Sequence, residues 1–155
     1  MDYRITGLSP EPFRALFALD DAALQAHGMR RVIADSKPGF PCRVSLEDAE
    51  PGESLLLLSW THLDVASPYR ASGPIFVREA AREECVMRNA IPEQQRTRLL
   101  SVRGYDADGW MHDAEVVEGA QLEPLIERFF DDPRIAFLHA HNARRGCYAC
   151  RIDRD

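Results

Sequence analysis

Residues 135–152, IAFLHAHNARRGCYACRI, decide the fold, because they predict two strands joined by a short polar loop. The segments Ile135–His141 and Cys147–Ile152 each mix aliphatic, aromatic and small side chains, a composition typical of strands. The residues between them are polar and include a glycine, as a tight connection requires. We therefore expect this stretch to close the chain as a β-hairpin.

Alternation along the first of these strands assigns its side chains to two faces. Side chains two residues apart in a strand point to the same face. His139 and His141 therefore project together with Phe137, whereas Leu138 and Ala140 face the other way, toward the core. We expect the histidine face to be the polar or cleft side of the sheet.

Cys147 and Cys150 form a CxxC pattern in the second strand, and their spacing of three residues points their sulfurs to opposite faces. We expect one of them to join the two histidines, with the hairpin loop deciding which. An even loop, Arg145–Gly146 or Ala143–Gly146, would bring Cys150 to the histidine face, and an odd loop would bring Cys147. The pattern is therefore a weak indication of a dithiol or zinc pair.

One hypothesis for the hairpin is a transition-metal site. The two histidines and one cysteine are common metal ligands, and His62 or His112 could supply a fourth. This hypothesis requires that a distant histidine comes close to the hairpin.

A second hypothesis is a catalytic thiol. His139, His141 and Cys147 are the candidate catalytic residues, since a cysteine beside a histidine or an arginine such as Arg144 or Arg145 can be an activated nucleophile. A purely structural role stays open, in which the histidines bond neighbouring strands and the cysteines fill the core.

Two loops earlier in the chain carry further candidate ligand-binding groups. Cys42 and Arg43 follow the turn-rich segment Ser36–Pro41, and Tyr69, Arg70 and Ser72 lie in a dense polar loop. Arginine binds carboxylate and phosphate groups in a bidentate manner. If these loops meet the hairpin, we expect Arg43 and Arg70 to anchor an anionic group. The remaining candidate ligand-binding residues lie on the hairpin loop, Asn142 and Arg144.

The rest of the chain predicts an α+β fold. Strands are expected at Tyr3–Thr6, Arg31–Ala34, Cys42–Leu46, Ser54–His62, Ile75–Arg78, Thr97–Tyr105 and Trp110–Val117. The last two flank Asp106-Ala107-Asp108-Gly109, a strong hairpin turn.

Helices are expected in three places, beginning at Ser9-Pro10-Glu11, over Asp21–Ala26 behind a capping Asp20, and over Glu118–Phe130. We expect one α+β domain over residues 1–155, in which a largely antiparallel sheet carries two or three packed helices.

Composition narrows the class of protein. The chain has 155 residues, 45% of them hydrophobic, and a net charge of −6. An acidic balance argues against binding to nucleic acid or to an anionic membrane, both of which need a basic surface. No secretory signal or membrane-spanning run is visible, so we expect a cytoplasmic protein whose four cysteines are thiols.

Four segments, GFPCRVSLEDAEPGE, SPYRASGPIFVRE, RGYDADG and HAHNARRGCYACR, together resemble a family of small bacterial proteins catalogued as domain of unknown function 1203. The resemblance extends over essentially the whole chain. It implies a stand-alone cytoplasmic bacterial domain, and it supplies no catalytic residue or cofactor.

The sequence thus predicts an enzyme or a binding protein for a small anionic molecule. We expect its ligand to lie in a cleft of arginine, histidine and cysteine side chains. Two alternatives stay open. One is a non-catalytic protein-interaction module, and the other is a transition-metal-binding protein that uses His139 and His141.

Overall fold

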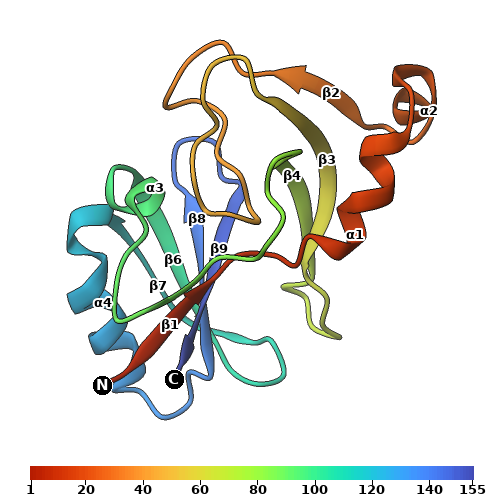
Figure 1. The fold of residues 1–155 in the computed structure, drawn as a ribbon. Coiled ribbons are helices and arrows are strands. Elements are labelled where there is room, and N and C mark those ends of the chain that lie inside the picture. The colour runs from red at the N-terminus through yellow and green to blue at the C-terminus, as the bar shows by residue number, and fades with distance from the viewer.

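Strands dominate the structure. The computed structural model describes residues 1–155, with 39% of them in strands and 19% in helices. The strands form two antiparallel sheets with helices packed on them (Figure 1). The predicted α+β class and the predicted C-terminal hairpin are both confirmed.

The larger sheet has six strands. In spatial order they are β5 (Val86–Arg88), β1 (Tyr3–Thr6), β9 (Tyr148–Arg154), β8 (Phe137–Asn142), β6 (Leu99–Tyr105) and β7 (Met111–Glu118). Because β1 pairs with β9, the two ends of the chain lie side by side (Figure 1). The hairpin strands β8 and β9 therefore occupy the centre of the sheet, where both are flanked by other strands.

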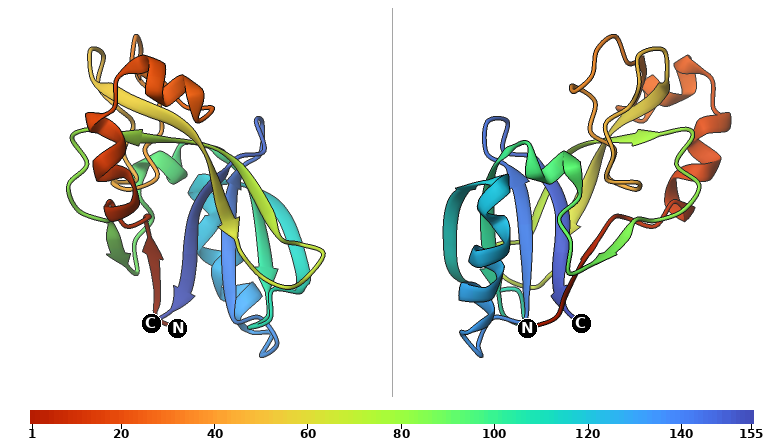
Figure 2. Two further views of the ribbon diagram at one scale, coloured as in Figure 1. Left: turned by 90° about the vertical axis from the view of Figure 1, so that its right-hand side faces the viewer. Right: turned by 60° about the vertical axis from the view of Figure 1, so that its left-hand side comes forward.

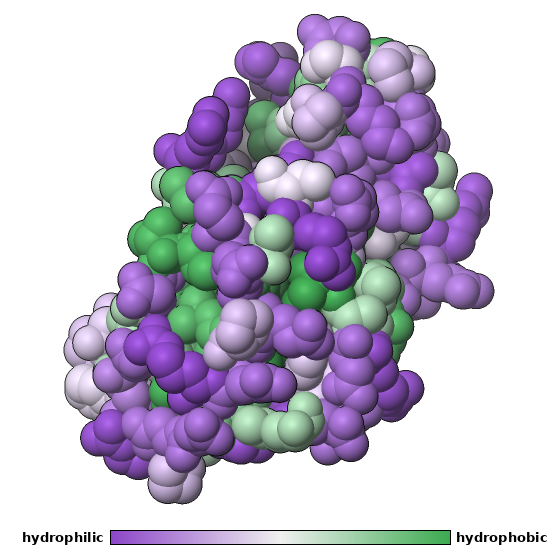
Figure 3. Space-filling view, turned by 90° about the vertical axis from the view of Figure 1, so that its left-hand side faces the viewer, coloured by the Kyte–Doolittle hydropathy of each residue, from purple (hydrophilic) through white to green (hydrophobic).

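The helix α4 (Leu122–Phe130) covers one face of this sheet. It follows a short 3-10 turn, η2 (Gly119–Gln121), and buries Leu125, Ile126 and Phe129 against Val102 and Leu138. The short helix α3 (Glu93–Arg96) lies near its start. On the outer surface of this side, polar side chains predominate and apolar ones show between them (Figure 3).

The smaller sheet contains β2 (Arg30–Ile33), β3 (Ser54–Leu63) and β4 (Ala71–Arg78). It packs against the N-terminal helices α1 (Glu11–Arg14), η1 (Ala15–Ala18) and α2 (Asp21–Ala26). Phe13 and Leu24 come from these helices and are fully buried against the sheet. The predicted cap is present, since Asp20 accepts a hydrogen bond from the backbone N–H of Ala23 at 2.8 Å.

The two sheets meet on the face of the larger sheet opposite α4 (Figure 2). Leu63 at the end of β3 packs there against Tyr105 of β6 and Phe137 of β8. The face of β8 that carries its histidines is therefore covered by the last residues of β3.

One predicted strand is wrong. Residues 42–46 form no regular strand and make a single isolated bridge, between Cys42 and Phe76. The backbone N–H of Cys42 bonds to the carbonyl of Glu47, which folds the segment back on itself, and Leu46 has a positive φ of 54°. A strand needs an extended chain, so this segment is a loop between the two sheets.

The other differences are small. The helix expected from Glu118 begins as the 3-10 turn η2, and two short elements, β5 and α3, were not predicted. None of the helices has the length and apolar composition that a bilayer crossing requires.

Candidate functional site

The hairpin between β8 and β9 contains a bulge that decides which side chains face the histidines. The loop has four residues, Ala143–Gly146, since the N–H of Asn142 bonds to the carbonyl of Cys147 at 2.9 Å. His141 then lies opposite Tyr148, but Ala140 lies opposite Cys150, so one extra residue, Ala149, is inserted in β9.

The predicted association of one cysteine with the two histidines is therefore wrong. An uninterrupted register after an even loop would place Cys150 opposite His139. The bulge shifts β9 by one residue, so Arg151 lies opposite His139 and Cys150 joins the core under α4. The residue that joins the histidine face is Tyr148.

A histidine cluster forms around this tyrosine. It consists of His62, His139, His141 and Tyr148. The ring of His62, from β3, stacks on Tyr148 with their centroids 5.2 Å apart and lies 5.0 Å from the ring of His141. The ring of His139 meets the edge of Tyr148 at 5.1 Å. Of the two distant histidines proposed from the sequence, His62 thus reaches the hairpin, whereas His112 binds Asp106 in another turn.

The histidines of the cluster are neutral. Burial, together with nearby arginines, lowers the pKa of His139 to about 2 and that of His141 to about 4. Burial, and then Arg103, also lowers the pKa of His62. Nδ1 of His141 lies 3.0 Å from the carbonyl oxygen of Gly146, which assigns the proton to Nδ1.

Each histidine also holds a buried nitrogen atom without a hydrogen-bond partner. These atoms are Nδ1 of His62, Nδ1 of His139 and Nε2 of His141. Most buried polar atoms in proteins are hydrogen-bonded, so three such atoms within one cluster call for an explanation. A metal ion does not provide it here, because no group of three or more His, Cys, Asp or Glu side chains is arranged to hold one.

The buried arginines divide into two kinds. Six arginine side chains are buried or half-buried, and four of them pair with a carboxylate, namely Arg31, Arg78, Arg98 and Arg151. Arg43 and Arg103 form no ion pair with any carboxylate. A charge inside a protein is costly unless it is paired, so these two positions are candidates for binding a negative charge that the protein itself does not supply as Asp or Glu.

Arg43 is fully buried and joins the loop 42–46 to the hairpin. Its Nε donates to the carbonyl of Tyr148 at 2.6 Å, Nη1 donates to the carbonyl of Pro41, and Nη2 lies 3.1 Å from Sγ of Cys147. Burial lowers the pKa of Arg43, while negative charge on Cys147 acts in the opposite direction. The arginine predicted to bind a ligand thus binds the predicted nucleophile instead.

Cys147 is the half-buried partner of this arginine. A second donor, Nδ2 of Asn142, lies 3.7 Å from its sulfur. No hydrogen bond joins this sulfur to His139 or His141, because Cys147 precedes Tyr148 and points to the other side of the strand. The groups around the thiol are an arginine and an amide, where the sequence predicted a histidine.

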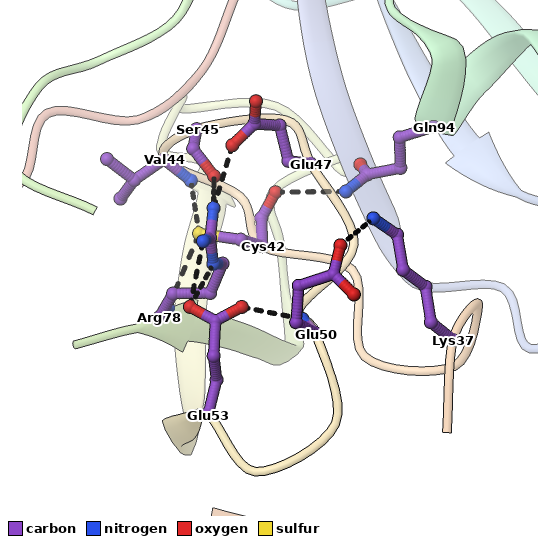
Figure 4. Close-up of polar contacts among 9 residues, drawn as sticks. All are labelled: Lys37, Cys42, Val44, Ser45, Glu47, Glu50, Glu53, Arg78 and Gln94. Carbon is purple, nitrogen blue, oxygen red and sulfur yellow. Dashed lines mark hydrogen bonds and ion pairs between the residues drawn. The ribbon is translucent and has the colours of Figure 1, made fainter. Parts of the chain in front are cut away.

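The other three cysteines are less suited to chemistry. All four are free thiols. Burial raises the pKa of Cys150 to about 12, and burial together with Glu47 raises the pKa of Cys85. Cys42 is fully buried, and its sulfur accepts the backbone N–H groups of Val44 and Arg78 (Figure 4).

A cavity of about 450 Å³, which the sequence did not indicate, lies beside Arg78. Arg78 donates to Glu53, Glu47 and Ser45 at its wall, and Lys37 pairs with Glu50 (Figure 4). Both cations of the cavity are therefore already neutralised by carboxylates, and an anionic ligand would have to displace one of them.

The polar loop after β3 lies away from the hairpin loop. Arg70 is exposed and pairs with Asp64 at 2.9 Å, and Ser72 shares a hydrogen bond with Thr61. Phe76, whose carbonyl binds the backbone of Arg43, lies six residues further along β4, or about 20 Å for an extended chain. The structure therefore does not bring Arg70 to Arg43.

Two predicted residues remain to be placed. Tyr69 is partly exposed and packs against Trp110 and Tyr105, whose ring in turn contacts His139. Arg144 is exposed on the hairpin loop. Neither of them contacts Arg43 or Cys147.

These features define an α+β protein with a buried histidine cluster and a thiol held by arginine. The chain belongs to the family described as "Protein of unknown function (DUF1203)", whose model matches residues 39–154. This range contains Arg43, Arg103, the histidine cluster and all four cysteines. No curated protein and no solved structure gives a significant match.

Proposed function

We propose that this protein is an enzyme of the bacterial cytoplasm that acts on a small molecule and uses Cys147 as its nucleophile. The observation that carries the proposal is the contact between Nη2 of the buried Arg43 and Sγ of Cys147 at 3.1 Å. Cys147 is the one side chain in contact with this guanidinium that can carry a negative charge.

Charge balance supports a negatively charged sulfur. A buried guanidinium is stabilised by an anion, and the two carbonyl groups that Arg43 also binds are neutral. The amide of Asn142 adds a second donor on the sulfur. A thiolate, and not a thiol, is the reactive form of cysteine, and arginine neighbours favour it.

Access separates Cys147 from two of the other three cysteines. It is half-buried on the hairpin, whereas Cys42 and Cys150 are fully buried. A reactive thiol also needs a compartment that keeps it reduced, which is why the proposal places the protein in the cytoplasm.

The proposed chemistry is attack on an electrophilic carbon. The sulfur forms a bond to the carbonyl carbon of an ester, and the alkoxide departs with the electron pair of the broken C–O bond and takes a proton from water. Water then cleaves the resulting thioester and restores the thiolate. Each turnover consumes one water molecule and requires no oxidant or metal.

The reactivity of the thiol is tested by alkylation with iodoacetamide between pH 6 and 9, followed by mass spectrometry of the cysteine peptides. Cys85, which is also partly exposed, is the internal reference. We expect Cys147 to react about tenfold faster than Cys85 at pH 7. A Cys147 that reacts no faster than Cys85 contradicts the proposal.

Two variants test whether Arg43 is the cause of the reactivity of Cys147. Arg43→Gln should slow the alkylation of Cys147 about tenfold and leave Cys85 unchanged. Arg145→Gln removes an exposed arginine of the hairpin loop beside Cys147 and should change neither rate.

Catalysis itself is tested with p-nitrophenyl acetate, for which we expect a stoichiometric burst of p-nitrophenolate that Cys147→Ser abolishes. An unchanged burst in the serine variant would exclude Cys147 as the nucleophile.

A further inference from the structure

The second arginine without a carboxylate, Arg103, lies at the histidine cluster. Arg103 in β6 is directly opposite His139 in β8, so the two side chains share the face that β3 covers. It is half-buried, and it lowers the pKa values of His62, His139 and His141. One unpaired cation and three buried nitrogen atoms without partners therefore occupy one region of the protein.

The charges around this region are mostly positive. Besides Arg103, Arg151 from β9 and Arg43 from the loop 42–46 act on the histidines. The carboxylate of Asp153 is occupied by Arg151 at 2.8 Å. The remaining titratable neighbours, Tyr105 and Tyr148, are neutral because burial raises the pKa of each phenol.

This charge distribution selects the kind of ligand. A cation would be repelled by the arginines and would find no free carboxylate. An oxyanion would accept hydrogen bonds from Arg103, whose planar guanidinium suits carboxylate, phosphate and sulfate groups. It would also accept a hydrogen bond from any imidazole that becomes protonated.

We propose that Arg103, His139, His141 and His62 form a binding site for a small oxyanion, and that the protein takes up a proton when the anion binds. The site lies on the opposite side of the β8–β9 hairpin from the sulfur of Cys147, and it does not depend on the reactivity of that thiol.

Proton uptake follows from the same geometry. Without a bound anion the buried imidazoles are neutral, and Nε2 of His141, whose Nδ1 proton is donated to Gly146, accepts hydrogen bonds and does not donate them. An anion placed among them compensates the charge of an imidazolium and supplies an acceptor for its N–H. By linkage, an anion that promotes protonation must bind more tightly at lower pH.

Sulfate is the probe for the test, because its charge stays constant between pH 5.5 and 8. Isothermal titration calorimetry at constant ionic strength should show binding that is about tenfold tighter at pH 5.5 than at pH 8. Titrations in buffers of different ionisation enthalpy should show net proton uptake. Binding that is independent of pH, or no binding at pH 5.5 up to 10 mM sulfate, would overturn the proposal.

Variants distinguish the site from general attraction of anions. Arg103→Gln should weaken sulfate binding at least about tenfold, and His139→Asn should reduce the pH dependence. Arg145→Gln, on the exposed loop, should bind sulfate as the wild type does. If Arg103→Gln keeps its circular dichroism spectrum and binds sulfate normally, the anion lies elsewhere. If Arg103→Gln unfolds, Arg103→Lys provides the same comparison, since it keeps the charge but loses bidentate binding.

Discussion

The guanidinium of Arg43 and the sulfur of Cys147 lie 3.1 Å apart, although 104 residues separate them in the sequence. The contact joins the loop 42–46 to the C-terminal hairpin, and it gives the buried cation its one partner that can be negatively charged. Both the packing of the loop and the chemistry of the thiol should therefore depend on it.

Substitution of Cys147 tests the structural side of this contact. Cys147→Val keeps the size of the side chain but leaves Nη2 of Arg43 without an acceptor, which should lower the free energy of unfolding by about 2 kcal/mol. Cys147→Ser retains an acceptor and should lose less than about 1 kcal/mol. Urea unfolding measures both values, and equal losses would show that the sulfur does not act as the acceptor.

The histidine cluster predicts a loss of stability in mild acid. The folded pKa values of His139 and His141, about 2 and about 4, lie below the ~6.5 of an unfolded histidine. Below pH 6.5 the unfolded chain takes up protons that the folded protein does not, so stability is complete above this pH and falls as the pH decreases.

The free energy of unfolding should fall by about 2 kcal/mol per histidine between pH 6.5 and 5, as measured by urea unfolding in chloride buffers. His141→Gln should flatten the dependence by one histidine's share, while substitution of the exposed His27 should leave the slope as it is. A stability that is constant from pH 7.5 to 5 would show that the histidines take up protons as readily in the folded protein as in the unfolded chain.

Gly7 predicts a packing effect on the thiol. A Cβ atom at Gly7 would lie 2.1 Å from the carbonyl oxygen of Val44, next to Arg43. Gly7→Ala should therefore destabilise the protein by at least about 2 kcal/mol, and displacement of the loop should slow the alkylation of Cys147. Gly73→Ala, where a Cβ meets nothing within 4 Å, is the matched control for thermal unfolding.

The ion pair between Asp48 and Arg98 predicts a stability effect of similar size. Asp48 is 8% exposed, and its carboxylate accepts two hydrogen bonds from Arg98, at 2.6 and 2.8 Å. Asp48→Asn leaves a half-buried arginine unpaired and should cost about 3 kcal/mol in chemical denaturation. The pair Glu11–Arg14 is highly exposed, so Glu11→Gln should change stability by less than about 0.5 kcal/mol.

Much of the fold could be predicted because its strands alternate regularly. The hairpin β8–β9 and the shared face of His139 and His141 follow from a period of two residues, and the structure confirms both. The segment Cys42–Leu46 has a similar composition but folds back through hydrogen bonds to distant residues, which local composition does not encode. The elements β5 and α3 have three and four residues, too few for a periodic pattern.

The candidate site was predicted only in part. Cys147 and Arg43 were selected from the sequence, but their contact depends on how the loop 42–46 folds. Arg103 was missed, although a charged residue between Val102 and Gly104 in a predicted strand was a signal that could have been used. The expectation that one of the two cysteines joins the histidine face was wrong because a bulge leaves no clear mark in the sequence.

That bulge has a further consequence for how such proteins can change. The extra residue Ala149 keeps Cys150 opposite Ala140, whereas a slip of the unchanged β9 into an uninterrupted register would carry Cys150 out of the core to the position opposite His139. Such a slip would place a sulfur among three imidazoles, the ligand set of a soft metal centre. Within this scaffold, a thiol–histidine site and a site for anions would thus be separated by a shift of one residue in the register of β9.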